Sequence, residues 1–173
     1  MNTRRIFSMS LGAVLALVLM LEVQAGDLPL VALAPNRSTK LSLTGPGMEP
    51  IHVTLSLTAL GSSYPYKSAL LWGGDVDELP KQIVAAVQVS EGGQVVFVPL
   101  SAYGDLGDVK SADLKPSERG FTLELHGGNT ASEYDAELKF AAGYLVSRKV
   151  ILRAFPNQRT ETATYMFPKR TEE

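Results

Sequence analysis

The chain contains no cysteine, so disulfide bonds, thiol catalysis and cysteine-ligated metal sites are excluded together. It has only two histidines, His52 and His126, each on the polar side of an alternating segment. Neither has a serine, carboxylate or second histidine at a sequence spacing typical of catalysis or zinc binding, so we expect both on the surface. The sequence also lacks a Gly-x-Ser-x-Gly elbow, a Walker loop and a dinucleotide fingerprint. These absences favour a protein that is not an enzyme, with no catalytic residue assigned.

An excess of basic charge is also missing. Lys and Arg total 16 against 18 Asp and Glu, which gives a formal net charge of −2. Proteins that bind nucleic acids neutralise phosphates with a basic surface. The charge balance therefore argues against a nucleic-acid partner.

The one long apolar run lies near the start of the chain. Arg4 and Arg5 precede the apolar stretch Leu11–Leu21, and Val23-Gln24-Ala25 fits a small-residue cleavage site. We predict that residues 1–25 are a cleaved secretory signal peptide and that the protein is periplasmic or secreted. Because Thr3–Phe7 resembles a twin-arginine signal, both that route and the general secretory route stay open. No later segment is apolar enough for a transmembrane helix in the mature chain.

Residues 26–173 suit a single all-β domain. The segment Ile51–Ala59 alternates strictly between apolar and polar residues, which predicts a strand with one buried face. The run Ile83–Val89 is almost entirely apolar and is typical of a central strand buried on both faces. We expect residues 101–120 to form a long crossover, with a short strand near Val109–Leu114. No segment shows sustained helical periodicity.

A faint internal repeat links residues 53–99 with residues 121–167. An offset of 68 residues gives eight identities in 47 positions, where average residue usage gives roughly three. The alternative is that two strand-rich segments set in phase match apolar to apolar. The identical pairs include Leu55 with Leu123, Tyr66 with Tyr134, and Ile83 with Ile151.

We predict an antiparallel β-sandwich of two roughly four-stranded sheets, with each repeat supplying about one sheet. An eight-stranded closed β-barrel is the alternative. Several charged residues of the second unit are expected on its outward faces, where they can form cross-strand pairs. These are Asp135, Glu137, Arg148, Lys149, Arg153, Arg159 and Glu161.

Two candidate sites follow from residue type. Tyr64, Tyr66 and Trp72 can form an aromatic platform for a ligand, although alternation also allows Tyr66 and Trp72 to be core residues. Asp75, Asp77 and Glu78 form an acidic loop of the kind that binds calcium through carboxylate oxygens. Asp105 and Asp108 join that loop only if both segments lie at the same end of the fold.

The leading hypothesis is an exported, non-catalytic β-domain that binds a protein, peptide or glycan of the cell envelope. One alternative is a hydrolase that uses Asp and Glu side chains brought together by folding, which requires two carboxyl groups facing each other in a cleft. Another alternative is a small outer-membrane β-barrel. The charged outward faces of the second unit argue against it, because they would contact lipid.

Overall fold

The computed structural model describes residues 30–61, 71–74, 79–158 and 160–167. The predicted signal peptide and five of the candidate site residues lie outside these ranges, so those predictions stay as they are. The five are Tyr64, Tyr66, Asp75, Asp77 and Glu78.

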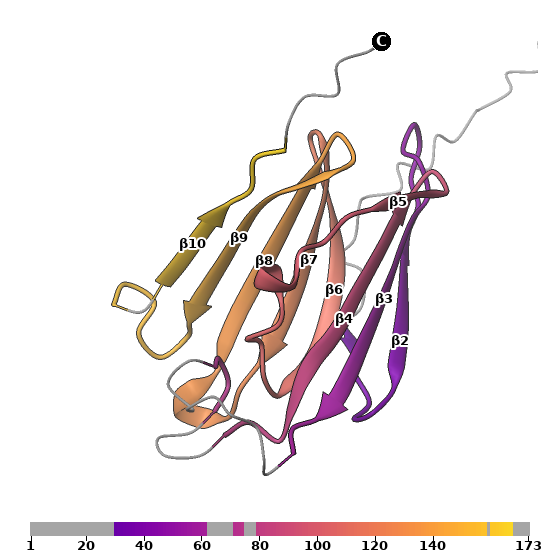
Figure 1. Cartoon of the computed structure of the whole chain (residues 1–173). Helices are drawn as coiled ribbons and strands as arrows, with labels where there is room; N and C mark the ends of the chain where they lie inside the picture. The colour runs from indigo at the N-terminus through magenta and orange to yellow at the C-terminus, as the bar shows by residue number, and fades with distance from the viewer. Residues whose placement is uncertain (1–29, 62–70, 75–78, 159, 168–173) are drawn as a thin grey trace, which may run out of the picture.

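The described residues form two antiparallel sheets that face each other (Figure 1). The larger sheet has the order β1-β6-β7-β8-β9-β10, and the smaller has the order β2-β3-β4-β5. The larger sheet consists of β1 (Val31–Ala32), β6 (Val109–Ser117), β7 (Gly120–Gly127), β8 (Tyr134–Ala141), β9 (Tyr144–Leu152) and β10 (Thr160–Thr164). The smaller consists of β2 (Ser38–Leu43), β3 (Ile51–Ala59), β4 (Gln82–Glu91) and β5 (Gln94–Val96). Short 3-10 helices lie at η2 (Leu100–Ala102) and η3 (Thr130–Ser132).

The predicted all-β antiparallel sandwich is confirmed, and neither sheet closes into a barrel. The strand count per sheet differs from the prediction. The expected crossover at residues 101–120 contains a full nine-residue strand, β6, which joins β1 in extending the larger sheet. No helix in the described ranges has the length and apolar character needed to cross a membrane.

Alternating side chains from both sheets build the core. Along β3, Ile51, Val53 and Leu55 are at most 1% exposed, while His52 between them faces solvent. In the larger sheet, Phe121 stacks on Phe140 with ring centroids 4.5 Å apart. Burying each such large apolar side chain stabilises the fold by about 1.5–3 kcal/mol. The burial of alternate residues fixes the register of each strand, because a one-residue slip would expose its apolar face.

Strand β4 is not buried on both faces as predicted, since Ala85 and Gln88 are exposed. A β-bulge explains the apolar run. Ser56 pairs with Ala86 and Leu57 pairs with Val84, which leaves Ala85 as an extra residue. The bulge shifts the alternation, so apolar residues three apart along β4 face the same core.

The 68-residue offset places β3 on β7, but the strands beside them do not correspond. Strand β4 pairs directly with β3, whereas the same offset places β4 on residues 150–159, at the end of β9 and beyond. Strand β9 pairs with β8 and β10 rather than with β7. The duplication itself stays a prediction.

The prediction that Arg148 and Glu161 face outward is wrong. Arg148 is 3% exposed and lies between the sheets, where its guanidinium contacts Ser101, Asp105 and Glu161. Adjacent residues on a strand point to opposite faces, so Arg148 and Lys149 cannot both face outward. Glu161 lies on the inner side with Arg148 and keeps 44% of its side chain exposed.

Candidate functional site

Trp72 is a core residue, as one of the two sequence interpretations held. It is 7% exposed, and its ring centroid lies 5.9 Å from that of Tyr134. Its indole N–H donates a hydrogen bond of 3.3 Å to Glu161. Trp72 is therefore not part of an exposed aromatic platform.

The segment around Trp72 lies against residues 105–108, while the acidic loop Asp75–Glu78 lies outside the described residues. The Trp72 amide donates to the Asp105 carbonyl at 2.8 Å. Asp105 Oδ2 is ion-paired with Arg148, although Asp105 Oδ1 is buried without a hydrogen-bond partner among the described residues. Asp108 Oδ1 accepts from the amides of Lys81 and Gln82. In the described residues these two side chains therefore stabilise the fold.

A groove of about 560 Å³ runs over β3, β4 and β5 of the smaller sheet. Its polar side comes from β3 and β4, where His52 is exposed, as expected, and contacts Ser42 at 3.0 Å. Among the described residues, its lining carries no Asp, Glu, Lys or Arg. The lining residues are His52, Thr54, Val87, Gln88, Val89, Ser90, Val95, Val96, Phe97 and Val98.

Two large apolar side chains of the groove lining are strongly exposed to solvent. Val95 is 87% exposed and Phe97 is 67% exposed. Strand β5 ends the smaller sheet in the described part of the chain, so one of its edges has no partner strand there. Edge strands are commonly protected by charged side chains, but residues 94–98 have none.

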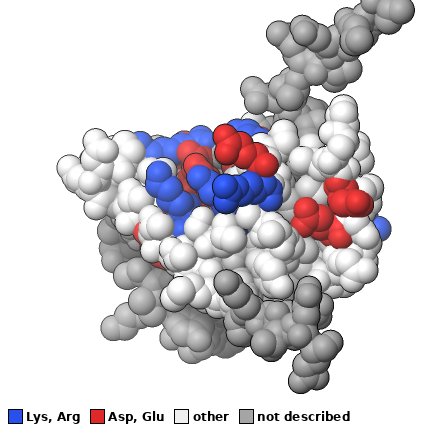
Figure 2. All heavy atoms as spheres, turned by 90° about the horizontal axis from the view of Figure 1, so that it is seen from above, with Lys and Arg blue, Asp and Glu red and all other residues white. Residues whose placement is uncertain are grey.

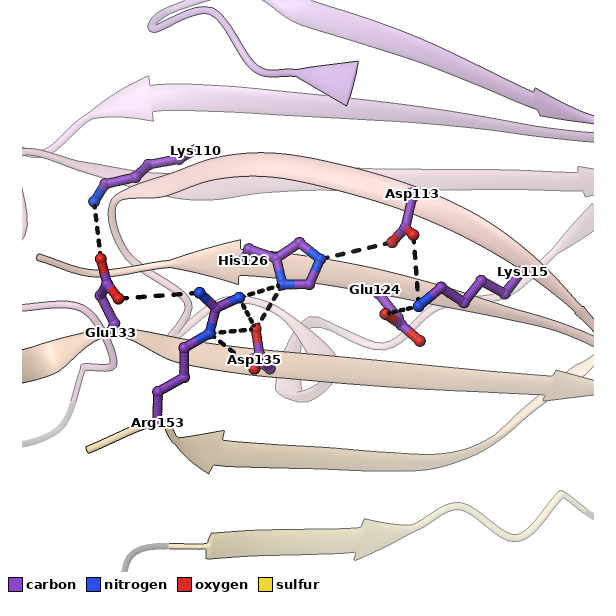
Figure 3. A network of polar contacts seen from close by, with 8 residues as sticks. All are labelled: Lys110, Asp113, Lys115, Glu124, His126, Glu133, Asp135 and Arg153. Carbon is purple, nitrogen blue, oxygen red and sulfur yellow. Dashed lines mark hydrogen bonds and ion pairs between the residues drawn. The ribbon is translucent and has the colours of Figure 1, made fainter. Parts of the chain in front are cut away.

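A cluster of charged and polar side chains lies on the outer face of the larger sheet (Figure 3). It arises from strand register: Asp113 of β6 pairs with Glu124 of β7, and His126 of β7 pairs with Asp135 of β8. Directly paired residues point to the same face, so four residues from three strands meet there. We call these four side chains, together with Lys115 and Arg153, the His126 cluster.

The His126 ring is held from one side by Asp135. The distance between His126 Nδ1 and Asp135 Oδ1 is 2.5 Å, and Arg153 Nη2 lies 3.0 Å from the same nitrogen. Because an imidazole nitrogen and a carboxylate oxygen approach this closely only with a proton between them, we assign that proton to Nδ1. Arg153 donates to Asp135 through Nε and Nη2. With Nδ1 engaged, Nε2 faces Asp113 Oδ1 at 3.7 Å.

Asp113 is the most buried member of the cluster, with 6% of its side chain exposed. Burial raises the pKa of its carboxyl group, and the charge of Glu124 raises it further, against the opposing effects of Lys115 and His126. Lys115 Nζ lies 2.7 Å from Glu124 and 3.7 Å from Asp113. The ammonium group therefore balances part of the negative charge.

Asp135 behaves differently because of its hydrogen bonds. Burial acts to raise the pKa of its carboxyl group, but hydrogen bonds from Arg153 and His126 outweigh burial and lower the pKa. The same contact with Asp135 raises the pKa of Arg153. Asp135 is therefore held as a carboxylate that orients the imidazole ring.

The partners of His126 were not predicted from the sequence, because they come from neighbouring strands. The His126 side chain is 19% exposed rather than fully on the surface. The usable signal is the alternation of Phe121–Leu125 and of Tyr134–Phe140, because pairing these two segments places His126 opposite Asp135 once the register is known. In the view of Figure 2, acidic and basic side chains lie together over one part of the surface, and a separate acidic group lies at the right.

Comparison of the chain with models of known families, with curated proteins and with solved structures finds no match.

Proposed function

We propose that the protein is a binding module that takes an extended, largely apolar segment of a partner protein along β5 and the neighbouring groove. The observation that carries this proposal is the exposure of Val95 on the edge strand β5 and of Phe97 directly after it, in a segment without charged residues. The predicted export signal and the predicted absence of a catalytic constellation are consistent with a role in the cell envelope.

An edge strand can pair with an incoming strand through backbone hydrogen bonds, and side-chain pockets then select alternate residues of that strand. The groove offers such a pocket, with Thr54, Gln88 and Ser90 as hydrogen-bonding groups and valines as apolar surface. Because no formal charge lines the groove, the contacting part of the partner is expected to be neutral.

A peptide fits these features better than a glycan. The exposed side chains Val95 and Phe97 lack hydrogen-bonding groups, and apolar contact suits aliphatic or aromatic residues of a peptide. A glycan offers many hydroxyl groups, and its recognition needs a higher density of polar partners than this side of the groove supplies.

The test begins with selection of short random peptides on the purified protein. The selected peptides are then titrated against the wild type, Phe97→Asp and Phe155→Asp by fluorescence anisotropy. Phe155 is the matched control, since it is 51% exposed in the turn after β9. We expect Phe97→Asp to weaken binding by about tenfold or more, while Phe155→Asp binds like the wild type.

Chemical-shift mapping supplies the second readout. Supporting data would show the largest amide shifts on β4 and β5 when peptide is added. Equal binding by the wild type and Phe97→Asp would refute the proposal. The proposal would also be refuted if the wild type bound a glycan but no peptide, and if Phe97→Asp lost that glycan binding.

A further inference from the structure

We propose that Asp113, Glu124 and His126 form a binding site for a divalent cation of the Zn²⁺ type on the outer face of the larger sheet. This site is independent of the groove beside β5, because it lies on the other sheet and uses none of the same residues.

The three side chains are placed to share one ion. One ligand atom from each residue can be chosen so that all three atoms lie within 4.8 Å of one another. Zinc bonds to histidine nitrogen and carboxylate oxygen are about 2.0–2.2 Å long, so ligand atoms of a common ion lie roughly 3–4 Å apart. The 3.7 Å between His126 Nε2 and Asp113 Oδ1 falls in this range.

Asp113 supplies an independent observation that points to a ligand. Its Oδ1 atom is buried and has no hydrogen-bond partner among the described residues, and the His126 nitrogen at 3.7 Å is too distant for one. A buried carboxylate oxygen without a partner is costly. A cation held between Asp113 and His126 would satisfy this atom.

The surroundings of His126 match those of a metal-binding histidine. Such a histidine usually donates its second ring N–H to a carboxylate, which fixes the ring and makes the ligating nitrogen more basic. Asp135 accepts this hydrogen bond from Nδ1, and Arg153 fixes Asp135 in turn (Figure 3). The free nitrogen, Nε2, is then directed toward Asp113.

Lys115 is the competitor for this position. Its ammonium group contacts Glu124 at 2.7 Å, but 42% of its side chain is exposed, so it can turn toward solvent when an ion binds. One imidazole nitrogen with two carboxylates suits Zn²⁺, whereas Ca²⁺ prefers six to eight oxygen ligands. We therefore expect Zn²⁺ to bind and Ca²⁺ not to bind.

The experiment is calorimetric titration of the metal-free purified protein with Zn²⁺, compared with Ca²⁺. The variant His126→Ala should weaken Zn²⁺ binding by about tenfold or more. His52→Ala is the matched control, because it removes the only other histidine of the chain, from an exposed position on the smaller sheet. Lys115→Gln should strengthen binding, because it removes the competing ammonium group.

A second probe separates ligation from folding. Co²⁺ bound by an imidazole and carboxylates absorbs visible light, and we expect this absorption in the wild type and Lys115→Gln but not in His126→Ala. Absence of Zn²⁺ binding in both the wild type and Lys115→Gln would overturn the proposal. Equal loss of binding in His52→Ala and His126→Ala would also overturn it, because the ion would then be bound elsewhere.

Discussion

Arg148 of β9 and Asp105 of the segment after η2 form an ion pair between the two sheets, with 2.8 Å between Nη2 and Oδ2. Arg148 also donates to the carbonyl of Ser101 at 3.0 Å. The guanidinium group thereby ties the segment that connects β5 to β6 onto the inner face of the larger sheet. This contact joins parts of the chain 43 residues apart.

Breaking this ion pair should destabilise the protein. Asp105→Ala leaves the buried guanidinium with Glu161 as its remaining charged partner. Because the Asp105 side chain is 29% exposed, we expect a loss of about 2–4 kcal/mol in the free energy of unfolding, below the upper end for fully buried pairs. Urea denaturation measures the change.

The exposed pair Lys139–Glu137 is the matched control for that prediction. Its atoms are 3.7 Å apart, and the Lys139 and Glu137 side chains are 55% and 31% exposed, so Glu137→Ala should cost less than about 1 kcal/mol. In a double-mutant cycle, Asp105→Ala and Arg148→Met should be strongly non-additive. Additive effects would show that the two side chains are not coupled.

Gly127 should not tolerate a larger residue. A Cβ atom at this position would lie 2.6 Å from the Tyr134 hydroxyl oxygen, inside the core. We expect Gly127→Ala to lower the unfolding free energy by about 1–3 kcal/mol. Gly45→Ala is the control, because a Cβ atom there has no neighbour within 4 Å among the described residues. A comparable loss in both variants, measured by urea denaturation, would contradict this account of Gly127.

Tyr134 should make stability depend on pH in alkaline solution. Burial raises the pKa of its hydroxyl group well above the ordinary value, and the charges of Asp105 and Asp108 raise it further, against the opposing effect of Arg148. In the unfolded chain the Tyr134 hydroxyl group ionises at about pH 10, while in the folded protein it stays protonated at that pH. The contribution is therefore complete below about pH 10 and is lost as pH rises, by up to about 1.4 kcal/mol per pH unit.

The variant Tyr134→Phe isolates this effect. At neutral pH it should be less stable by roughly 1–2 kcal/mol, because the 2.8 Å hydrogen bond to the Gly107 carbonyl is lost. Above about pH 10 its unfolding free energy should fall less steeply than that of the wild type. Parallel pH profiles of the two proteins would rule out the contribution of Tyr134.

Fluorescence can check the position of Trp72, the only tryptophan in the chain. Because Trp72 is 7% exposed, iodide should quench its emission weakly in the folded protein and strongly in urea. Strong quenching without denaturant would instead place the indole on an exposed surface, as the aromatic-platform hypothesis required.

The fold class was predictable because alternation is a local property. Ile51–Ala59 shows its buried face in the residue order itself, and the structure has strand β3 with the same bounds. The apolar run at Ile83–Val89 misled for a physical reason: a bulge at Ala85 changes which residues face inward, and residue order does not reveal a bulge. The length of strand β6 was underestimated, because the polar composition of residues 101–120 suggested a loop.

The sequence by itself determined that this is a cysteine-free, all-β chain with alternating strands, since hydrophobic periodicity is read residue by residue. Only the tertiary structure decided which side chains meet. Strand register brought His126 against Asp113 and Asp135, and the packing of the two sheets turned Arg148 inward toward Asp105. Both arrangements depend on which strands pair and with what offset, and these are long-range choices that no local pattern specifies.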